Sequence, residues 1–381
     1  MNFWEFRKLE FERRDKQLQH AIPMQLKKTN EKKPLLHIVY VMTWVGLCGG
    51  SKIILQHANY LVERGHAVTI ICHFAKPSWF TLDKKVCFTH VPMGEILCEH
   101  IPPCDVIVAT YWKEIYECTA QNIAPVVYFE QGDTHLFKPQ SMDVRTLSHI
   151  RKQIAVAPFV FTVSSFAQEK LMEHFNKKSH VIPNAVDKAI FFPKARQEIN
   201  VDEDKKIVIT AIGSENIAFK NITNIVVAVT LLKKLGHPIE FIWISPDAPQ
   251  KLTTIPVNIN PNQSVIGECL RRTDIYVCAS NYESFCLPVL EAMTCGAAVI
   301  TTDNGGIRDF VKDHVNALLI EKNNIADIMA KIEDLISQPN KRQQLAHEGL
   351  KTAEAFSWAR TTDDLTCYYQ DIARYTIENK Q

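Results

Sequence analysis

The sequence of 381 residues lacks a long uninterrupted hydrophobic run after its first residue. Charged residues recur through Arg14, so neither a signal peptide nor a membrane-spanning segment is predicted there. We therefore expect a cytoplasmic protein, and a peripheral position at the inner face of a membrane stays open.

The sequence also lacks an excess of charge of either sign, paired cysteines and internal repeats. The formal net charge is +1 and 22% of the residues are charged, so we expect a small-molecule substrate and no nucleic-acid partner. The eleven cysteines are scattered without a Cys-x-x-Cys pair, which favours a reducing compartment and argues against a zinc site. The sequence has no repeat of fixed period, so a solenoid is not predicted.

Residues 1–33 differ from the rest of the chain because they hold nine Lys or Arg against five Asp or Glu. Phe3, Phe6 and Leu9 can share one stripe of a helix. A basic amphipathic helix of this kind can lie on an anionic membrane surface. The alternative is a helix that packs on its own domain or on a second copy of the chain.

From Leu35 onward, apolar strands alternate with amphipathic helices, the pattern of a parallel sheet covered on both faces. The first unit has a strand at His37–Val41, a tight turn at Gly46–Ser51, a helix at Lys52–Arg64 and a strand at Ala67–Cys72. Further strands are predicted at Val86–Val91, Asp105–Thr110, Val126–Glu130, Phe159–Ser164 and His180–Ile182.

A second α/β domain follows a polar, charged stretch. Its predicted strands are Ile207–Ile212, Ile239–Ile244, Asp274–Ala279 and Ala298–Thr302, and its predicted helices are Asn224–Leu235, Pro288–Thr294 and Ile325–Ser337. The predicted organisation is an extension at 1–33, an N-terminal α/β domain at 34–190, a linker at 191–204, a C-terminal α/β domain at 205–357 and a returning helix at 358–381.

The most informative segment runs from Glu283 to Glu291, between two predicted parallel strands. Pro288 suits the first turn of a helix, which would point the backbone amides of Phe285 to Leu287 at a diphosphate. Glutamates beside a diphosphate are best explained as acceptors of hydrogen bonds from ribose and sugar hydroxyls. Alternatively, both glutamates only cap the helix and complement its dipole. The predicted donor-binding residues here are Ser284, Phe285, Cys286, Leu287 and Glu291.

This segment resembles the motif of two glutamates separated by seven residues in the family 4 retaining glycosyltransferases, which have the GT-B architecture of two Rossmann-like domains facing across a cleft. Other segments resemble the family in the same order, so the resemblance covers the chain from about Leu35 to its end. They are Gly49–Ser51 with Leu61–Thr69, Thr162–Ser165, Val181–Asp187, Arg272–Val277, Thr302–Gly306 and Phe356–Trp358.

The resemblance implies that Glu283 contacts the transferred sugar and that Glu291 binds the nucleotide ribose. It also implies an arginine and a lysine that neutralise the leaving diphosphate. Lys220 stands where the lysine is expected, at the end of the segment that begins at Gly213, but Ser214 occupies the place of the arginine.

The N-terminal half should supply the acceptor side and a glycine loop over the donor. Gly49 and Gly50 allow a close backbone approach to a phosphate or sugar, although such a pair is often only a turn. Family members often carry a histidine after the strand equivalent to Val126–Glu130, where it touches the sugar. Here the candidates are His135, Asp133, Gln131 and Glu130, with a structural role equally open.

Two further patterns point away from other chemistries. Asp202–Asp204 has the Asp-x-Asp form of a metal-binding motif, but it precedes a strand within a charged stretch, so we expect a solvated turn and no metal requirement. Gly46–Gly50 lacks the Gly-x-Gly-x-x-Gly order, and no acidic residue ends the second strand at Cys72, which disfavours a dehydrogenase.

The sequence therefore predicts a retaining, metal-independent glycosyltransferase of the hexosyltransferase type, without a cofactor, in which Lys220, Glu283 and His135 are the candidate catalytic residues. It would move a sugar from a nucleotide-diphosphate sugar to a glycan, lipid-linked or small-molecule acceptor, as in polysaccharide biosynthesis. A nucleotide-sugar epimerase or hydrolase and a non-catalytic partner subunit of the same fold are the alternatives. Residues 1–33 could mediate membrane contact or self-association.

Overall fold

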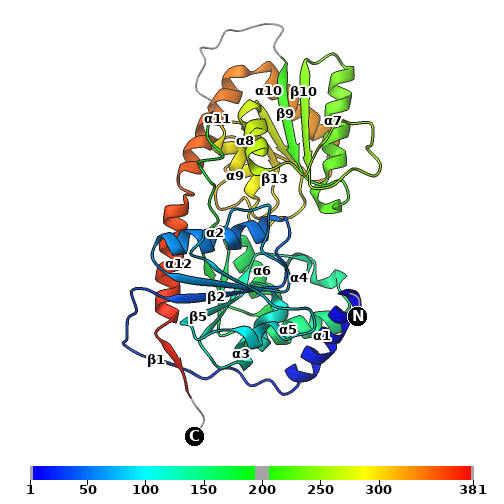
Figure 1. The fold of residues 1–381 in the computed structure, drawn as a ribbon. Helices are drawn as coiled ribbons and strands as arrows, with labels where there is room; N and C mark the ends of the chain where they lie inside the picture. Colours follow the sequence, from blue (N-terminus) through cyan, green and yellow to red (C-terminus); the bar gives the residue numbers. More distant parts are fainter. Residues whose placement is uncertain (1–2, 194–205, 379–381) are drawn as a thin grey trace. The chain divides into compact units, whose positions relative to one another are not determined.

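Two separate parallel sheets account for the alternation of strands and helices in the sequence (Figure 1). The computed structural model describes residues 3–193 and 206–378. The chain forms two compact units, unit 1 with Met1–Pro183 and Ala359–Gln381, and unit 2 with Asn184–Trp358.

The passage from unit 1 to unit 2 comes earlier than the predicted linker at 191–204, most of which lies outside the described residues. Residues 184–193 pack with unit 2: Phe191 is fully buried, and Arg271 donates a hydrogen bond of 2.8 Å to the carbonyl oxygen of Ile190. The prediction that the N-terminal domain extends to residue 190 was therefore wrong, because Phe191 is buried in unit 2 and is not part of an exposed linker.

Unit 1 is built on a sheet of seven parallel strands in the order β4-β3-β2-β5-β6-β7-β8. Side chains alternate across it, so Val39 and Val41 face a core that includes Ile115 of α3 and Ile150 of α5, while Tyr40 points to the opposite face. The strands are β2 (His37–Met42), β3 (Ala67–Cys72), β4 (Cys87–His90), β5 (Val106–Ala109), β6 (Val126–Glu130), β7 (Phe159–Thr162) and β8 (His180–Val181).

Helices cover both faces of this sheet, with α2 and α12 on one side and α3 and α5 on the other (Figure 1). The helix α12 (Trp358–Ile372) packs with unit 1: its Tyr369 hydroxyl lies 3.0 Å from the buried hydroxyl of Tyr40. The remaining helices of unit 1 are α1 (Phe3–Leu18), α2 (Gly49–Glu63), α3 (Ile115–Ala120), α4 (Thr134–Phe137), α5 (Val144–Val156) and α6 (Ser165–Phe175).

The N-terminal helix α1 packs on its own domain, against α3 and α5 (Figure 1). The contact is built on buried charges, because Arg14 is 2% exposed and lies 2.8 Å from Glu117 and 3.2 Å from Glu10. After the helix, β1 (Leu26–Lys28) pairs antiparallel with β15 (Tyr375–Ile377). Of the two alternatives for residues 1–33, packing on the same chain is the one observed for α1; the side chains of Phe3 and Phe6 lie outside the described set.

Unit 2 is built on six parallel strands in the order β11-β10-β9-β12-β13-β14. One face packs against α7 and α10 through residues such as Ile225 and Ile332, and the other packs against α8 through Ile266. The strands are β9 (Ile207–Ile212), β10 (Ile239–Ser245), β11 (Asn258–Ile259), β12 (Ile275–Cys278), β13 (Ala298–Thr302) and β14 (Leu318–Ile320), and the helices are α7 (Ile222–Lys234), α8 (Gln263–Arg272), α9 (Leu287–Thr294), α10 (Ile325–Ser337) and α11 (Pro339–Glu354).

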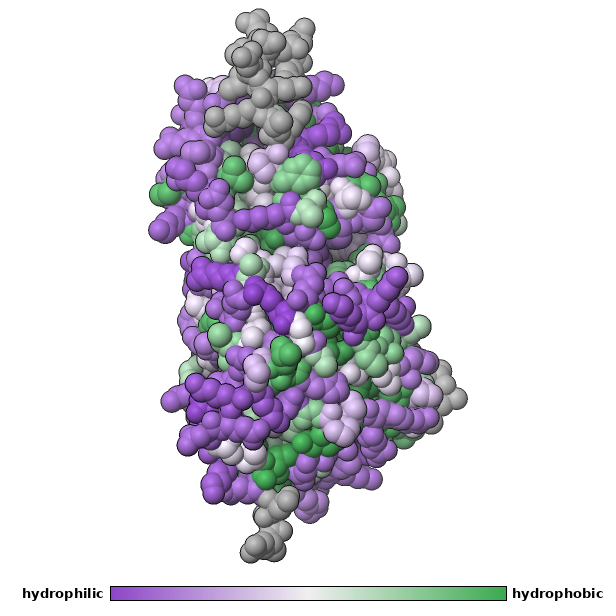
Figure 2. Space-filling view, turned by 60° about the vertical axis from the view of Figure 1, so that its left-hand side comes forward, coloured by the Kyte–Doolittle hydropathy of each residue, from purple (hydrophilic) through white to green (hydrophobic). Residues whose placement is uncertain are grey.

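The surface is predominantly hydrophilic on the face shown in Figure 2, where hydrophobic residues form small groups. Among the helices of the described residues, none is both long and apolar enough to span a bilayer.

Candidate functional site

The sheet of unit 2 has a topological switch point between β9 and β12. Strand order runs outward from β9 to β10 and β11 on one side, and from β12 to β13 and β14 on the other. Ligands of open α/β sheets bind in the crevice outside the carboxyl ends of the strands at such a point. The segments that follow β9 and β12 carry Lys220 and Glu283, respectively.

Lys220 and Glu283 form an ion pair at this switch point, with Nζ 2.6 Å from Oε1. Their side chains are partly exposed, 22% for Lys220 and 14% for Glu283. Burial disfavours the ammonium form, but the charge and hydrogen bond of Glu283, together with the two nearby cysteines, raise the pKa of Lys220 above its ordinary value. Lys220 is therefore a permanent cation at neutral pH, and the structure places the two predicted catalytic residues of unit 2 in direct contact.

Asn221 fixes the two loops that carry this pair. Its side-chain amide donates to the carbonyl oxygen of Ala279 at 3.0 Å and to Oδ1 of Asn281 at 2.9 Å. The backbone amide of Asn281 returns a hydrogen bond of 2.8 Å to the carbonyl oxygen of Phe219. Asn221 adopts a left-handed conformation with φ of 51°, which asparagine tolerates better than most residues. The motifs that predict the donor site do not include Asn221.

The loop after β13 supports Glu283 from the other side. Glu283 forms an isolated parallel bridge with Gly305, and its amide donates to the carbonyl oxygen of Asn304 at 2.9 Å. A Cβ atom at Gly306 would lie 2.6 Å from the backbone nitrogen of Phe285 and 2.7 Å from the carbonyl oxygen of Glu283. Only glycine fits there, so Gly306 allows the close approach of the two loops.

The predicted diphosphate-binding segment ends at the start of α9, whose first residue is Leu287 and whose second is Pro288. The side chains of Phe285 and Cys286 are buried, at 2% and 4% exposed, so their backbone groups are what this segment can present to a ligand. Glu291 is 7% exposed and is the fifth residue of the helix. The helix begins one residue before its predicted start at Pro288, which places Glu291 just beyond the first turn.

Ser214 is integrated into a polar network at the end of β9. Its side chain is buried, and its hydroxyl accepts a hydrogen bond of 3.0 Å from the backbone amide of Asn216. Hydrogen bonds from the side chains of Ser214, the larger contribution, and Asn216 lower the pKa of Asp247. Beside it, the carbonyl oxygen of Gly213 accepts the indole NH of Trp243 at 2.9 Å. Both positions thus have structural partners, and Ser214 brings no positive charge.

In unit 1, Gly49 and Gly50 form the first turn of α2. The prediction that they belong to a tight turn before the helix was wrong, because α2 begins three residues before Lys52. Cys48 caps this helix, since its sulfur accepts the amide of Ser51 at 3.4 Å, which starts the helix at the glycines. The side chain of Gln131, from the segment after β6, donates to the carbonyl oxygen of Gly50 at 3.4 Å. The structure therefore joins two candidate segments of this domain.

His135 lies in an ion pair inside unit 1. Its Nε2 is 2.7 Å from Oε2 of Glu130, and the two side chains are 1% and 2% exposed. Glu130 also accepts the Tyr128 hydroxyl at 2.7 Å and the amide of Gly132 at 2.6 Å. Burial works against both charges, yet their mutual attraction raises the pKa of His135 and lowers the pKa of Glu130. The imidazole thus holds the turn after β6 and is not presented to solvent.

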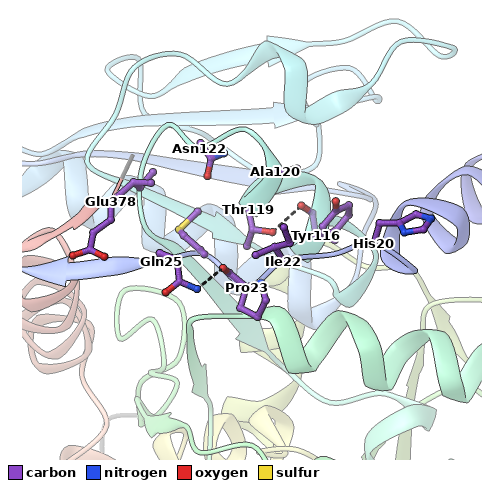
Figure 3. Close-up of a pocket in the computed structure, with 11 residues that line it drawn as sticks. His20, Ile22, Pro23, Gln25, Tyr116, Thr119, Ala120, Asn122 and Glu378 are labelled. Carbon is purple, nitrogen blue, oxygen red and sulfur yellow. Dashed lines mark hydrogen bonds between the residues drawn. The ribbon is translucent and has the colours of Figure 1, made fainter. Parts of the chain in front are cut away.

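A cavity of about 350 Å³ lies elsewhere in unit 1, where the connection after α1 meets α3 and the C-terminal strand (Figure 3). Gln25, Tyr116 and Glu378 are among its lining residues, and it includes none of the predicted site residues. Over residues 3–193 and 206–378, no group of three His, Cys, Asp or Glu could hold a metal ion. The Asp202–Asp204 motif falls outside these ranges.

Comparison with known proteins finds a family match for the segment that contains Glu283. Residues 248–352 match the model of the family described as glycosyl transferases group 1. The match covers 105 of the 381 residues of the chain. The matched range contains β12, α9 and the loop after β13.

Curated glycosyltransferases are similar to parts of the chain. A D-inositol 3-phosphate glycosyltransferase of Rhodococcus erythropolis is 29% identical over 147 residues, which is 39% of this chain and 30% of that protein. An uncharacterized glycosyltransferase of Methanocaldococcus jannaschii is 26% identical over 221 residues, 56% of this chain and 60% of that protein. The matches thus span about a third to three fifths of these relatives.

Solved structures resemble the chain over most of its length. Sucrose-phosphate synthase from Thermosynechococcus elongatus has a TM-score of 0.72 at 16% identity, covering 88% of this chain and 98% of its own. Anabaena HepE in complex with UDP-glucose has a TM-score of 0.68 at 15% identity, covering 87% and 98%. The chain has the GT-B fold, which confirms the predicted fold class.

Proposed function

We propose that the protein is a retaining glycosyltransferase that binds a nucleotide-diphosphate sugar at the switch point of unit 2. The observation that carries this proposal is the Lys220–Glu283 ion pair beside the start of α9. A diphosphate needs a cation and backbone amides, and the transferred sugar needs acceptors for its hydroxyls. Lys220, the segment Phe285–Leu287 and Glu283 supply these groups. The match of residues 248–352 to the model of the glycosyl transferases group 1 family supports the same function.

The ammonium group of Lys220 has three N–H donors and uses one of them on Glu283, so it can also contact a diphosphate. We propose that Lys220 contacts the phosphate oxygens and that Glu283 accepts sugar hydroxyls. Negative charge develops on the diphosphate as the glycosidic bond breaks, and a fixed cation in a partly buried site stabilises that charge. The ribose would bind Glu291, whose side chain is largely buried.

Retention of configuration would follow if the departing diphosphate itself took the acceptor proton on the same face of the sugar. We propose that neither a metal ion nor a cofactor takes part, since Lys220 supplies the charge at the diphosphate. The acceptor would bind to unit 1, at the segments after β2 and β6 that Gln131 and Gly50 connect. In this arrangement His135 is a positioning residue, because it holds Glu130 and the turn that begins at Gln131.

The first test is thermal unfolding of the protein with UDP-, GDP-, ADP- and dTDP-sugars. A donor at about 100 times its dissociation constant adds about 2.7 kcal/mol to the free energy of unfolding. We expect one nucleotide to raise the melting temperature in the wild type, and Lys220→Ala and Glu291→Ala to abolish this rise. A folded wild-type protein that none of these donors stabilises would contradict the proposal. The anomeric configuration of the product, read by NMR, tests retention.

A further inference from the structure

Two cysteine thiols meet at the switch point of unit 2. Cys278 is the last residue of β12 and Cys286 immediately precedes α9, and their sulfur atoms are 3.7 Å apart. Both side chains are buried. The side-chain amide nitrogen of Asn304, Nδ2, also lies 3.7 Å from the sulfur of Cys286. The two sulfurs are therefore in van der Waals contact, and a disulfide would require them to approach to about 2 Å.

The backbone of Cys286 is unusual for its residue type. It adopts a left-handed conformation with φ of 65°, where glycine is unstrained and a residue with a Cβ atom is not. Among the described residues, the other non-glycine residues with positive φ are five asparagines and one histidine, types that tolerate this region. A thiol thus stands where the backbone favours glycine, and strain of this kind gathers at functional sites.

The two thiols are not equivalent. The hydrogen bond from Cys286, followed by groups of Ser280, lowers the pKa of Cys278 to about 7 despite burial, whereas the pKa of Cys286 is raised well above its ordinary value. Cys278 is therefore the nucleophile of the pair, since the thiolate is the reactive form. A second buried pair, Cys98 and Cys118, has its sulfurs 3.6 Å apart in the core of unit 1, but the pKa of Cys98 is raised.

We propose that Cys278 and Cys286 form a reversible disulfide when a hydroperoxide reaches the donor site, and that this disulfide blocks donor binding. The second half of the proposal rests on the proposed function. The Cys278 thiolate attacks a peroxide oxygen, the O–O bond breaks to give a sulfenic acid, and the departing hydroxide or alkoxide takes up the proton that the Cys278 thiol released when it ionised. The sulfur of Cys286 then attacks that of Cys278, and the S–O bond breaks with release of water. Two thiols lose two electrons and the peroxide gains them.

The effect on the donor site follows from the chain between the two cysteines. Residues 279–285 connect them and include Glu283 and Phe285. Drawing Cys286 toward the end of β12 shifts the first residue of α9 and the backbone that packs against Gly306 at close range. The contact between Lys220 and Glu283 and the position of the helix amides cannot both be kept. A dithiol reductant reverses the disulfide by thiol exchange.

The test treats the reduced, full-length protein with hydrogen peroxide, blocks the remaining thiols by alkylation and maps disulfides by mass spectrometry. Affinity for UDP-glucose, or for whichever sugar of the donor panel stabilises the protein, is measured before and after by calorimetry. We expect a Cys278–Cys286 cross-link, a loss of affinity of at least about tenfold, equivalent to about 1.4 kcal/mol, and recovery with dithiothreitol. Failure to find this cross-link would overturn the proposal, as would a cross-link that leaves donor affinity unchanged.

Matched variants assign the effect. Neither Cys278→Ser nor Cys286→Gly can form the cross-link. For each variant, the donor affinity after peroxide treatment should therefore equal the affinity of the same variant before treatment. Cys98→Ser should remain as sensitive as the wild type, because its pair lies in the other unit. If no nucleotide sugar binds even the reduced protein, the proposed function fails, whereas the disulfide map still decides whether the two thiols react.

Discussion

Nε2 of His135 lies 2.7 Å from Oε2 of Glu130, and both side chains are almost completely buried. The pair joins the end of β6 to the short helix α4, and the charges raise the pKa of His135 and lower the pKa of Glu130 in spite of burial. A buried ion pair that loses one partner leaves an uncompensated charge, which costs about 3 to 5 kcal/mol. The turn between these residues depends on the charge state of both.

The stabilisation by this pair should depend on pH in a defined direction. Because the folded-state pKa of His135 is raised, its contribution is complete below about pH 6.5, the ordinary pKa of histidine, and is lost as the pH rises through the raised pKa. Because the pKa of Glu130 is lowered, its contribution is lost only as the pH falls through that lower value. Urea unfolding should show a larger difference between wild type and His135→Gln at about pH 6 than at about pH 9.

His57 supplies a control with the opposite sign. It is buried between aromatic rings, including that of Phe129 at 5.3 Å, and burial lowers its pKa to about 3. The wild type should therefore lose stability relative to His57→Phe as the pH falls below about 6.5, toward the folded-state value. A difference that follows the same pH direction for both histidines would contradict the assignment of charge states.

Arg14 should be essential for the packing of α1. Its guanidinium is almost fully buried, 2.8 Å from Glu117 and 3.2 Å from Glu10. Arg14→Ala would remove the buried cation that Glu10, Glu114 and Glu117 share, although Glu10 keeps Arg7 and Glu117 keeps Arg13. We expect a loss of about 3 kcal/mol in the free energy of unfolding, the low end of the range for a broken buried ion pair. Arg64→Ala is the matched control, because Arg64 and Asp363 form a pair that is about half exposed, and such pairs contribute at most about 1 kcal/mol. Equal losses in urea unfolding would show that burial is not what matters.

Most strands of the two sheets were predictable because the central ones are buried on both faces and read as short apolar runs. The edge strands β11 and β14 were not predicted. β6, β9 and β13 begin and end at the residues expected from the sequence. The pairing of β1 with β15 was not, since three mainly polar residues near each end of the chain carry no strand pattern and meet only through tertiary contact.

The candidate site shows the same division. Motif order placed Lys220 and Glu283 at the same edge of one sheet, but their direct ion pair joins residues 63 positions apart. The pairs Glu130–His135 and Cys278–Cys286 depend on side-chain directions that spacing does not give. The burial of Phe191 was missed because an aromatic pair followed by proline and charged residues resembles a linker.

Gly306 should tolerate no side chain, because a Cβ atom would meet the backbone of Glu283 and Phe285 at 2.6 to 2.7 Å. Gly306→Ala must therefore separate the two loops, and overpacking of this kind costs about 1 to 3 kcal/mol. We expect a lower melting temperature and weaker donor binding. Gly49→Ala is the control for stability, since nothing lies within 4 Å of its added Cβ atom; its melting temperature should stay close to that of the wild type.

Lys220→Ala should reduce turnover far more than it reduces stability. Without the ammonium, the charge that develops on the leaving diphosphate has lost its cation, and Ser214 offers no replacement. Loss of one such stabilising group lowers kcat by about 100- to 1,000-fold, equivalent to about 2.7 to 4 kcal/mol. Lys234→Ala, at the exposed C-terminal end of α7, removes a surface charge from the same unit and should leave kcat unchanged. Steady-state kinetics with the identified donor would refute the role of Lys220 if both variants turned over at the wild-type rate.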